Sequence, residues 1–290
     1  MAPVTEICVF PGDDLQSVLD TAPENSRIRL AEGVYRQKLM LRTNGLTLEG
    51  AGAGKTVLVY DDHAKKPHPI GYEYNTFRTY TLAVCADGVT IRNLSVVNDA
   101  GDPKTKGQEV ALSVLGTDFL MEDSSLISTQ DTLFAGPLPS DLIGRYEGFL
   151  LDPLRRGGSL KQVFRNCLIE GSVDFIFGCG ETLFDRCEIR SVADGRSEGY
   201  VAAPSHHLSQ EVGFRFYRCR FTAGEQVEAG SVYLARPWRD HGLAVFEHCE
   251  YDKHISAVGF DPWSGTQRDQ TARFREIPAV PGRVPWANRR

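Results

Sequence analysis

The chain has 290 residues, with 32 Lys and Arg against 38 Asp and Glu, and its formal net charge is −6. Hydrophobic residues make up 41% of the sequence, which is typical of globular proteins and excludes a disordered or collagen-like chain. No apolar run approaches the roughly 18 residues that a membrane-spanning helix needs. The acidic balance argues against a protein that binds nucleic acid by neutralising phosphates.

The first residues and the cysteines bear on the cellular compartment. The N-terminal sequence MAPVTEICVFPGDDLQ has neither the basic nor the apolar segment of a signal peptide. The seven cysteines are an odd number and form no CxxC pair, which favours a reducing compartment and argues against zinc. We therefore expect a cytoplasmic protein, or a secreted one if this sequence is a truncated form.

The first expected element is a short helix at residues 12–22. Apolar residues recur there at i, i+3 and i+4 from Leu15, and Asp13 or Asp14 could cap the start of the helix. Helical periodicity is scarce after this point, and short β-branched or aromatic runs alternate with Gly, Asn and Asp. The clearest runs are residues 27–30, 46–49, 57–60, 81–84, 89–97 and 110–114. This pattern predicts an all-β chain.

A weak internal repeat indicates how these strands are arranged. Cys167, Cys187, Cys219 and Cys249 occupy the same position in segments such as VFRNCLIEG and LFDRCEIRS, at spacings of 20, 32 and 30 residues. Such spacings match single turns of a parallel β-solenoid. We expect the four cysteines to form a buried ladder, because free cysteine is among the most buried residue types. A redox or metal role is the alternative.

No second domain is predicted. We expect one β-solenoid domain over residues 1–290, with a single large excursion at 136–158 that is rich in Gly, Pro and charge. The aperiodic tail at 278–290 is expected to pack across the solenoid. No sequence feature demands self-association.

Five polar residues stand where solenoid strands are expected. They are Gln108 in GQEVALSV, Gln130 and Asp131 in TQDTLF, Asp174 in SVDFIFG and Arg236 in LARPW. The interval from Gln108 to Gln130 is about one coil, and that from Asp131 to Asp174 is one coil plus the excursion. Since neighbouring coils lie about 4.8 Å apart, these side chains should meet on one sheet, with Arg236 reaching back over about two coils.

This set of side chains suits acyl transfer at an ester. Two close carboxylates repel each other, so one is driven to keep its proton while a guanidinium keeps the other ionised. An ionised Asp can act as a nucleophile, a protonated Asp can donate to a leaving group, and two amides can stabilise an oxyanion.

Each residue alone also has an ordinary interpretation. Asp174 could be a turn residue, Gln108 a solvated side chain, Arg236 half of a surface ion pair and Trp238 plain packing. Gln130 and its neighbour at position 131 would point to opposite faces of a regular strand, so both can act only at a strand end or bend. The joint occurrence at coil spacing favours function.

At these residues the chain resembles the pectin methylesterase (pectinesterase) family. The matching segments are DLQSVLDTAPENS, GVYRQKLML, GQEVAL, QDTLF, SVDFIFG, LARPW and GFDPW, in the family's order and over roughly residues 12–263. The resemblance implies a right-handed parallel β-helix. It also implies hydrolysis of galacturonate methyl esters, in pectin or in methylated oligogalacturonides, to acid and methanol.

The resemblance assigns a role to each polar residue. Asp174 is the nucleophile, and Asp131 is the general acid and then the base that activates water. Gln108 and Gln130 line the oxyanion hole, and Arg236 holds Asp174 and keeps it ionised.

The resemblance also implies an apolar wall beneath the sugar, formed by Trp238, Phe134 and Phe177. Chemistry of this kind needs no metal and no organic cofactor. Neither nucleic acid nor a membrane is expected as a partner.

The sequence departs from the family pattern at three places. Gln37 stands where Glu is usual, which we interpret as structural, and Ala235 stands where Gly is usual. The segment YVAAPSHH at 200–207 lacks a polar, often basic element that helps to bind neighbouring carboxylates. His206 and His207 could replace that element or could belong to a solvated loop.

The excursion at 136–158 adjoins Asp131 and is longer than in the plant and secreted bacterial enzymes of the family. It could wall off one end of the cleft, which would suit short, imported oligogalacturonides. Arg155 and Arg156 could meet a substrate carboxylate or form a solvated pair of charges.

Two other functions compete with ester hydrolysis. A pectate or pectin lyase would need a base beside the proton α to the carboxyl group, and it would leave an unsaturated sugar end rather than methanol. A non-catalytic carbohydrate-binding solenoid would bind without turnover and would tolerate Asp174→Asn. The paired Gln and Asp residues with a second Asp fit the esterase better than either alternative.

Overall fold

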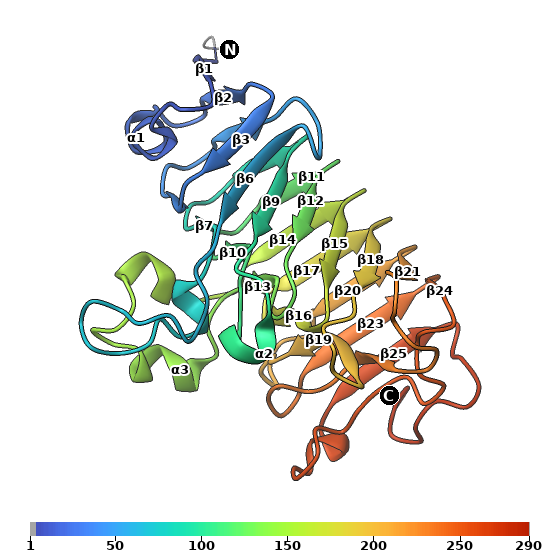
Figure 1. Cartoon of the computed structure of the whole chain (residues 1–290). Helices are drawn as coiled ribbons and strands as arrows, with labels where there is room; N and C mark the ends of the chain where they lie inside the picture. Colours follow the sequence, from blue (N-terminus) through green and yellow to red (C-terminus); the bar gives the residue numbers. More distant parts are fainter. Residues whose placement is uncertain (1–3, 290) are drawn as a thin grey trace.

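A computed structural model describes residues 4–289, which form three parallel β-sheets of ten, seven and eight strands wound into a parallel β-helix (Figure 1). The ten-stranded sheet contains β1 (Glu6–Val9), β2 (Arg27–Leu30), β5 (Thr47–Glu49), β8 (Thr90–Arg92), β11 (Phe119–Glu122), β14 (Lys161–Arg165), β17 (Glu181–Asp185), β20 (Phe214–Tyr217), β23 (Leu243–Glu247) and β25 (Arg273–Ile277). The seven-stranded sheet contains β4 (Leu39–Leu41), β7 (Leu82–Val84), β10 (Leu112–Val114), β13 (Leu133–Ala135), β16 (Val173–Gly178), β19 (Gly199–Pro204) and β22 (Val232–Ala235). The eight-stranded sheet contains β3 (Gly33–Arg36), β6 (Thr56–Tyr60), β9 (Ser95–Asn98), β12 (Ser125–Ile127), β15 (Leu168–Gly171), β18 (Glu188–Ser191), β21 (Arg220–Ala223) and β24 (Glu250–Tyr251). This arrangement confirms the predicted all-β parallel β-helix.

The core lies between the three sheets and is built from like side chains stacked in register. The rings of Phe164, Phe184, Phe216 and Phe246 stack from coil to coil, with centroids 5.3, 4.6 and 4.7 Å apart. Every one of these side chains is at most 1% exposed. The in-register stacking fixes which residues of successive coils are neighbours, and therefore which polar residues can meet on the outer face.

The four repeat cysteines form the predicted ladder beside this stack. The thiol of Cys187 donates to a backbone carbonyl of the preceding coil at 3.4 Å, and those of Cys219 and Cys249 do the same at 3.3 and 3.4 Å. Burial raises the pKa of Cys187 well above its usual range, so this thiol keeps its proton and remains a donor. The ladder interpretation is therefore confirmed, with Cys167, Cys187 and Cys219 buried and Cys249 at the end of the row only partly buried.

The predicted N-terminal helix is α1 (Leu15–Thr21), which packs over the first coils. Leu15 and Leu19 are fully buried, and Asp14 caps the helix through its side chain. The Gln37 amide oxygen accepts from the backbone N–H of Leu15 at 3.0 Å, and its NH2 group donates to the carbonyl of Asp13. The departure at Gln37 is therefore structural, as we interpreted it, because this side chain fixes the start of α1.

The C-terminal tail covers the last coil, as expected, over its described part 278–289. Trp286 is 8% exposed and packs on Phe274 at a centroid distance of 5.8 Å. Asn288 donates from its backbone N–H to the Phe274 carbonyl and accepts from the backbone N–H of Glu276 through its side chain. The tail thereby occupies hydrogen-bonding groups of β25, the last strand of its sheet.

The excursion at 136–158 leaves the solenoid after β13 and returns to it at β14. It contains α3 (Ser140–Arg145) and a 3-10 turn at Asp152–Arg155, and Figure 1 shows it beside the solenoid near β13 and β16. The Arg78 guanidinium stacks on the Phe149 ring at 3.4 Å, and its Nε donates to the Phe149 carbonyl at 2.9 Å. These contacts hold the excursion against the helix-like turn Thr76–Arg78 of the solenoid.

Two further helical elements belong to loops. They are α2 (Pro103–Lys106) and the 3-10 turn Arg268–Gln270. No helix in residues 4–289 is both long enough and apolar enough to span a membrane.

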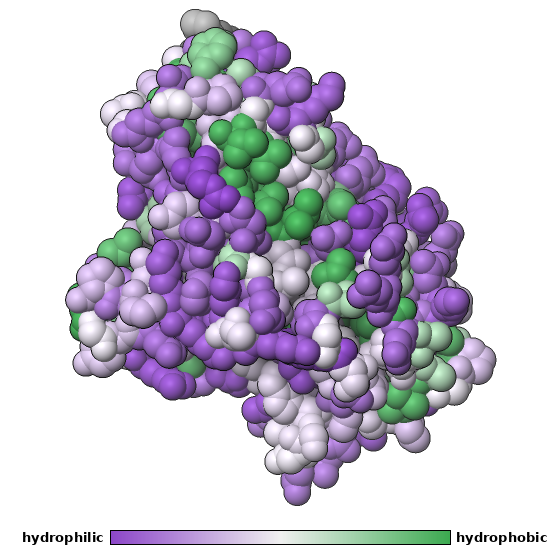
Figure 2. Space-filling view, in the orientation of Figure 1, coloured by the Kyte–Doolittle hydropathy of each residue, from purple (hydrophilic) through white to green (hydrophobic). Residues whose placement is uncertain are grey.

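Figure 2 shows a largely hydrophilic surface with an apolar patch over the eight-stranded sheet, near β3, β6 and β9. Val34 is 60% exposed there and lies beside Val57 in the register of β3 and β6. Val97 and Ile127 are neighbours in the same way in β9 and β12. The patch lies on a different sheet from the predicted catalytic residues, which belong to the seven-stranded sheet and the turns around it.

Candidate active site

A cavity of about 380 Å³, called the catalytic cavity below because it holds the predicted catalytic residues, lies on the outer face of the seven-stranded sheet. Seven of the eight predicted site residues line it, and they are Gln108, Gln130, Asp131, Asp174, Phe177, Arg236 and Trp238. Residues separated by up to 130 positions in the sequence thus meet in one place, as the coil spacing predicted.

Gln130 and Asp131 both reach the cavity because the backbone bends at this point. Asp131 has a φ of +63°, in the left-handed region, and its N–H donates to the Val173 carbonyl at 3.1 Å. A regular strand would place the two side chains on opposite faces. A non-glycine residue in this conformation costs on the order of 1 kcal/mol, and the bridge to Val173 holds it there.

Asp174 is presented by an irregularity in β16. The register with β19 shifts between Val173 and Ile176, and Asp174 itself has a φ of +49°. Phe175 and Ile176 both point into the core, whereas Asp174 and Phe177 both face the cavity. Such a bulge breaks the two-residue alternation of the strand, and here it aims a carboxylate and an aromatic ring into the same cavity.

Arg236 follows β22 and forms a two-point ion pair with Asp174. Its Nε donates to Oδ1 at 2.8 Å and its Nη2 to Oδ2 at 2.7 Å. The guanidinium lies between the rings of Tyr200 and Trp263, at 3.8 and 4.2 Å from their centroids. Burial acts to lower the pKa of Arg236, but the contact with Asp174 outweighs it and the pKa is raised. The pair therefore stabilises the negative charge of Asp174.

The surroundings of Asp131 favour its protonated form, whereas those of Asp174 favour a negative charge. Burial raises its pKa well above the usual range, and the negative charge of Asp174 raises it further, against the opposing effects of Arg236, Gln130 and Arg196. Asp131 therefore keeps its proton at a pH where an exposed aspartate has lost it. The site combines one carboxylate held by an arginine with one protonated carboxylic acid.

The two glutamines supply amide donors at the same cavity. Gln108 lies in the turn before β10, where its carbonyl accepts from the Ala64 N–H at 2.9 Å. The Gln130 Oε1 accepts from Arg196 Nη2 at 2.7 Å, which leaves its NH2 group as a donor. Both side chains line the cavity beside Asp131.

Glu109 lies buried next to these glutamines. Its side chain accepts from the Thr129 hydroxyl at 2.8 Å, and its other carboxyl oxygen has no hydrogen-bond partner among the described residues. Burial raises the pKa of Glu109 to about 7. Glu109, in the GQEV segment, is thus a second carboxyl group with a raised pKa, in addition to Asp131, and the sequence reasoning did not single it out.

The aromatic wall differs from the prediction in one residue. Trp238 and Phe177 line the cavity with an edge-to-face contact at 5.8 Å. Phe134 is 1% exposed and lies beneath this wall, with ring centroids 5.0 Å from Phe77 and 5.1 Å from Phe177. The prediction that Phe134 forms the sugar-binding surface is therefore wrong, because Phe77, from the turn before β7 two coils away, covers it.

Comparison with known proteins identifies the family to which this fold belongs. The family model described as "Pectinesterase" matches residues 12–137 and 156–287. The chain belongs to the pectinesterase family. It is thus a member of a family of carboxylic ester hydrolases, and the central part of the excursion, residues 138–155, lies outside the family match.

Individual relatives cover nearly the whole chain. Pectinesterase 31 of Arabidopsis thaliana is 31% identical over 94% of this chain and 82% of its own length. Pectin methylesterase from carrot superposes with a TM-score of 0.82 at 23% identity, over 99% of this chain and 87% of the carrot chain. A pectin methylesterase solved in complex with a hexasaccharide gives a TM-score of 0.73 at 24% identity, over 88% of this chain and 81% of the other.

The excursion at 136–158 contributes a different arginine from those predicted. Arg155 pairs with Asp152 at 3.1 Å, and Arg156 pairs with Asp87 at 2.6 Å. Neither arginine lines the catalytic cavity. Arg145, at the end of α3, does line it, so the expectation for Arg155 and Arg156 is replaced by one for Arg145.

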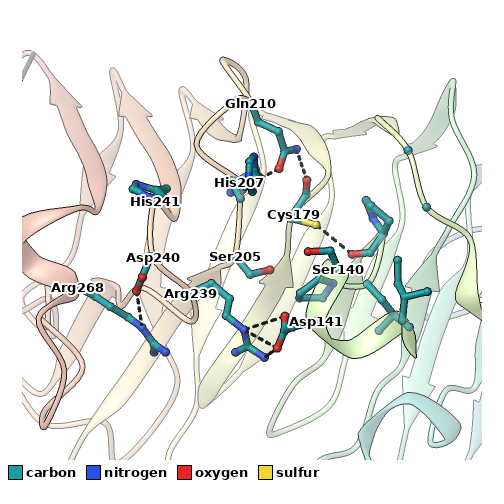
Figure 3. Close-up of a pocket in the computed structure, with 17 residues that line it drawn as sticks. Ser140, Asp141, Cys179, Ser205, His207, Gln210, Arg239, Asp240, His241 and Arg268 are labelled. Carbon is teal, nitrogen blue, oxygen red and sulfur yellow. Dashed lines mark hydrogen bonds and ion pairs between the residues drawn. The ribbon is translucent and has the colours of Figure 1, made fainter. Parts of the chain in front are cut away.

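His206 and His207 lie outside the catalytic cavity and do not replace the missing polar element. His206 is fully buried, donates from Nε2 to the Gly180 carbonyl at 3.0 Å and accepts from the Leu243 N–H. Burial lowers the pKa of His206 to about 4, so it is a neutral structural residue. His207 lies beside a second cavity, shown in Figure 3.

This second cavity has a volume of about 670 Å³ and lies beyond α3, at the carboxyl ends of the strands. Arg239 lines both cavities and pairs with Asp141 of α3 at 2.9 Å. Figure 3 shows this pair and the pair of Asp240 with Arg268 on the cavity wall. The two arginines are thus neutralised, and the Arg239–Asp141 pair ties α3 to the loop that carries Trp238.

The sequence reasoning did not name eight of the residues that line the catalytic cavity. They are Thr76, Phe77, Leu142, Arg145, Tyr146, Ala203, Arg239 and Trp263. Trp263 could have been found, because it ends the GFDPW segment that carries the family resemblance. Phe77 and Tyr146 lie in irregular segments with no period, and only the fold brings them to the site.

Proposed function

We propose that this protein is a pectin methylesterase that hydrolyses the methyl esters of galacturonate units and releases methanol. The observation that carries the proposal is the pairing of two unlike carboxyl groups. Asp174 is held by Arg236 through two hydrogen bonds, whereas Asp131 is buried and its pKa is raised. One group is thereby suited to attack and the other to donate a proton.

In the first half of the reaction, a carboxylate oxygen of Asp174 attacks the ester carbonyl carbon. The NH2 groups of Gln108 and Gln130 donate to the carbonyl oxygen as it gains negative charge. The bond to the methoxy oxygen then breaks, and Asp131 gives its proton to that oxygen, so methanol leaves. The galacturonyl group remains bound to Asp174 as an acid anhydride.

In the second half, water attacks the same carbonyl carbon and loses a proton to Asp131. The same two amides stabilise the second oxyanion. The bond to Asp174 breaks, which releases the free acid and restores both aspartates to their starting states. Arg236 remains paired with Asp174 before and after the reaction and orients its carboxylate for attack.

The apolar wall supports a sugar as the bound group. Trp238 and Phe177 present rings to the cavity beside Asp174, and such rings pack against the apolar face of a pyranose. The relative solved with a hexasaccharide supports an oligosaccharide in a cavity of this kind.

We further infer that short oligogalacturonides are the preferred substrates. Leu142, Arg145 and Tyr146 of the excursion line the catalytic cavity and narrow it. Arg145 makes no ion pair with any residue of the described chain, 4–289, whereas Arg236 and Arg239 are both paired. A guanidinium in this position suits the free carboxylate of an adjacent, already demethylated unit.

Methanol release tests the proposal directly. Wild-type protein and Asp174→Asn would be given methylated trigalacturonate and long, methylated pectin. We expect methanol from wild type and at least a 1,000-fold loss in the variant, since the nucleophile is removed. An unsaturated sugar end without methanol would instead identify a lyase. Binding without any product, unaffected by Asp174→Asn, would identify a carbohydrate-binding protein.

The same assay tests the substrate length. We expect a higher kcat/KM for the trimer than for long pectin. Equal values for both substrates would contradict the preference for short chains but would leave the esterase assignment in place.

A further inference from the structure

A loop outside the predicted site reaches one of the two oxyanion-hole amides. Arg196 lies between β18 and β19, on the coil after the one that carries Asp174. Its Nη2 donates to Oε1 of Gln130 at 2.7 Å. Arg196 is therefore directly bonded to a residue of the catalytic cavity, although it is absent from the cavity lining itself.

The Arg196 side chain is itself held in place. Its backbone N–H donates to Oδ1 of Asp194 at 3.0 Å, and its Nη1 lies 3.4 Å from Oδ2 of the same residue. The Asp194 side chain is 3% exposed and also accepts from the Ser172 hydroxyl at 2.6 Å. The backbone N–H of Ser172 in turn donates to the Thr129 carbonyl at 2.6 Å. The contacts form a closed loop that begins and ends beside Gln130.

We propose that Arg196 is a positioning residue that fixes the orientation of the Gln130 side-chain amide, so that its NH2 group faces the reacting carbonyl oxygen. This inference rests on the proposed function, because it concerns the oxyanion hole of that reaction. An amide group has one acceptor end and one donor end. When a cation engages the oxygen, the donor end is turned the other way.

The same contact strengthens Gln130 as a donor. A guanidinium on the amide oxygen draws electron density from the nitrogen, so the N–H groups become more acidic and bind a developing oxyanion more strongly. Without Arg196 the amide can rotate by half a turn, which would aim its oxygen at the oxyanion and repel it. The benefit arises only once negative charge develops, so Arg196 acts on the transition state more than on substrate binding.

Arg196 also acts on the acid of the site. The charges that face Asp131 are Asp174 on β16, Arg236 after β22 and Arg196, and both arginines lower the raised pKa of Asp131. Removal of Arg196 should therefore raise the pKa of Asp131 further.

The test compares Arg196→Met with Arg190→Met. Arg190 is a matched control, because its side chain is 35% exposed against 29% for Arg196 and it pairs with Glu188 on β18, away from the cavity. With methylated trigalacturonate, we expect Arg196→Met to lower kcat roughly 30-fold, less than the roughly 10²- to 10³-fold loss that follows removal of an oxyanion-hole donor itself, and to change KM less than twofold. Arg196→Lys should restore part of the rate, and Arg190→Met should match wild type.

A double variant separates positioning from a general loss of structure. Gln130→Ala should lower kcat, and the addition of Arg196→Met to it should lower kcat no further, because the amide that Arg196 orients is already gone. Additive losses in the double variant would overturn the proposal, as would a kcat of Arg196→Met equal to that of Arg190→Met.

The titration of Asp131 gives a readout that does not depend on turnover. In protein labelled with carbon-13 at the aspartate carboxyl groups, the Asp131 resonance should titrate at higher pH in Arg196→Met than in wild type and Arg190→Met. An unchanged titration would overturn the proposal, even if wild type released no methanol. Absence of methanol from wild type would by itself count against the proposed function and not against this contact.

Discussion

Two aspartates of the same chemical type are given different properties by their surroundings. Asp174 is paired at two points with Arg236, whereas Asp131 is buried and faces the negative charge of Asp174. Each lies in a left-handed backbone conformation, which removes it from the alternation of its strand. The local backbone therefore determines that the side chains meet, and burial and charge determine which of them holds the proton.

The pH dependence of the reaction should follow Asp131. Its pKa is raised, so it stays protonated as the pH increases past the usual range for aspartate, and kcat/KM should fall only when the pH passes this raised value. Asp131→Asn should lower kcat at least roughly 100-fold, and its residual activity should lack this alkaline decrease. A decrease of the same shape in wild type and Asp131→Asn would assign it to another group.

Glu109 should affect the pH dependence of the stability of the fold, and not that of the reaction. Its pKa is raised by burial from 4.5 to about 7 in the folded protein, so folding favours the neutral form. The stability that this neutral carboxyl contributes is fully present below about pH 4.5 and is lost as the pH rises through 7. Glu109→Gln cannot ionise, so this loss does not occur in the variant. The free energy of unfolding of the variant minus that of wild type should therefore increase by about 3 kcal/mol between pH 4.5 and pH 8.

Urea denaturation of both proteins at the two pH values measures this gain. The comparison between pH values cancels any constant effect of the substitution. A difference between the two proteins that does not change with pH would show that Glu109 ionises in the folded state as easily as in the unfolded chain.

At the scale of the element, the excursion at 136–158 supplies part of the wall of the catalytic cavity. Its Arg145 should bind the free carboxylate of the sugar unit next to the ester. Arg145→Gln should lower kcat/KM about 10-fold for a trimer with one free carboxylate next to the ester. For a fully methylated trimer, the change should be less than twofold. Arg155→Gln is the matched control on the same excursion, since Arg155 pairs with Asp152 outside the cavity. Equal losses on both trimers would contradict a role in carboxylate recognition.

Much of the element pattern could be predicted from the sequence. Solenoid strands are short and their inner faces repeat from coil to coil, so the cysteine spacing alone located four successive coils. The backbone bends could not be predicted, because the left-handed φ of Asp131 and the bulge after Val173 depend on contacts with neighbouring coils. Sequence reasoning could state only that Gln130 and Asp131 need such a bend if both are to act.

The two errors in the predicted site, at Phe134 and at Arg155 and Arg156, also arise from contacts between distant segments that the sequence does not show. Phe134 belongs to the outer face, as predicted, but Phe77 from a turn two coils away in the sequence covers it. The choice between Arg145 and Arg155 depends on how a six-residue helix is rotated against the solenoid, and a single turn and a half of helix shows too little periodicity to predict this. The charged residues of the excursion indicated that it could meet the substrate, but they could not indicate which arginine lines the catalytic cavity.

At the scale of the whole molecule, the closure of the solenoid ends should control both stability and association. The tail packs Trp286 on Phe274 and occupies hydrogen-bonding groups of β25 through Asn288. Trp286→Ala should lower the free energy of unfolding by about 3 kcal/mol, as for other large buried aromatics. Removal of residues 278–290 should in addition expose the edge of β25 and cause the protein to self-associate.

Thermal denaturation and light scattering test these two expectations. His248→Ala serves as a control, because its side chain is 54% exposed on the surface of the last coils. A shortened protein that stays monomeric and as stable as the full chain would show that the tail does not protect this end.

The excursion leaves the solenoid at the end of β13 and re-enters it at the start of β14 without disturbing the register of the strands on either side, where Leu133 still pairs with Ile176 and Met121 with Phe164. Asp131, Asp174 and Arg236 are all supplied by the seven-stranded sheet and its turns. We therefore expect that this segment can be exchanged for one of different length or charge while the three residues proposed for hydrolysis keep their arrangement. Loops from relatives could be grafted between positions 138 and 155. This offers a direct way to engineer esterases that prefer substrates of another methylation pattern or chain length, without a change in the β-helix.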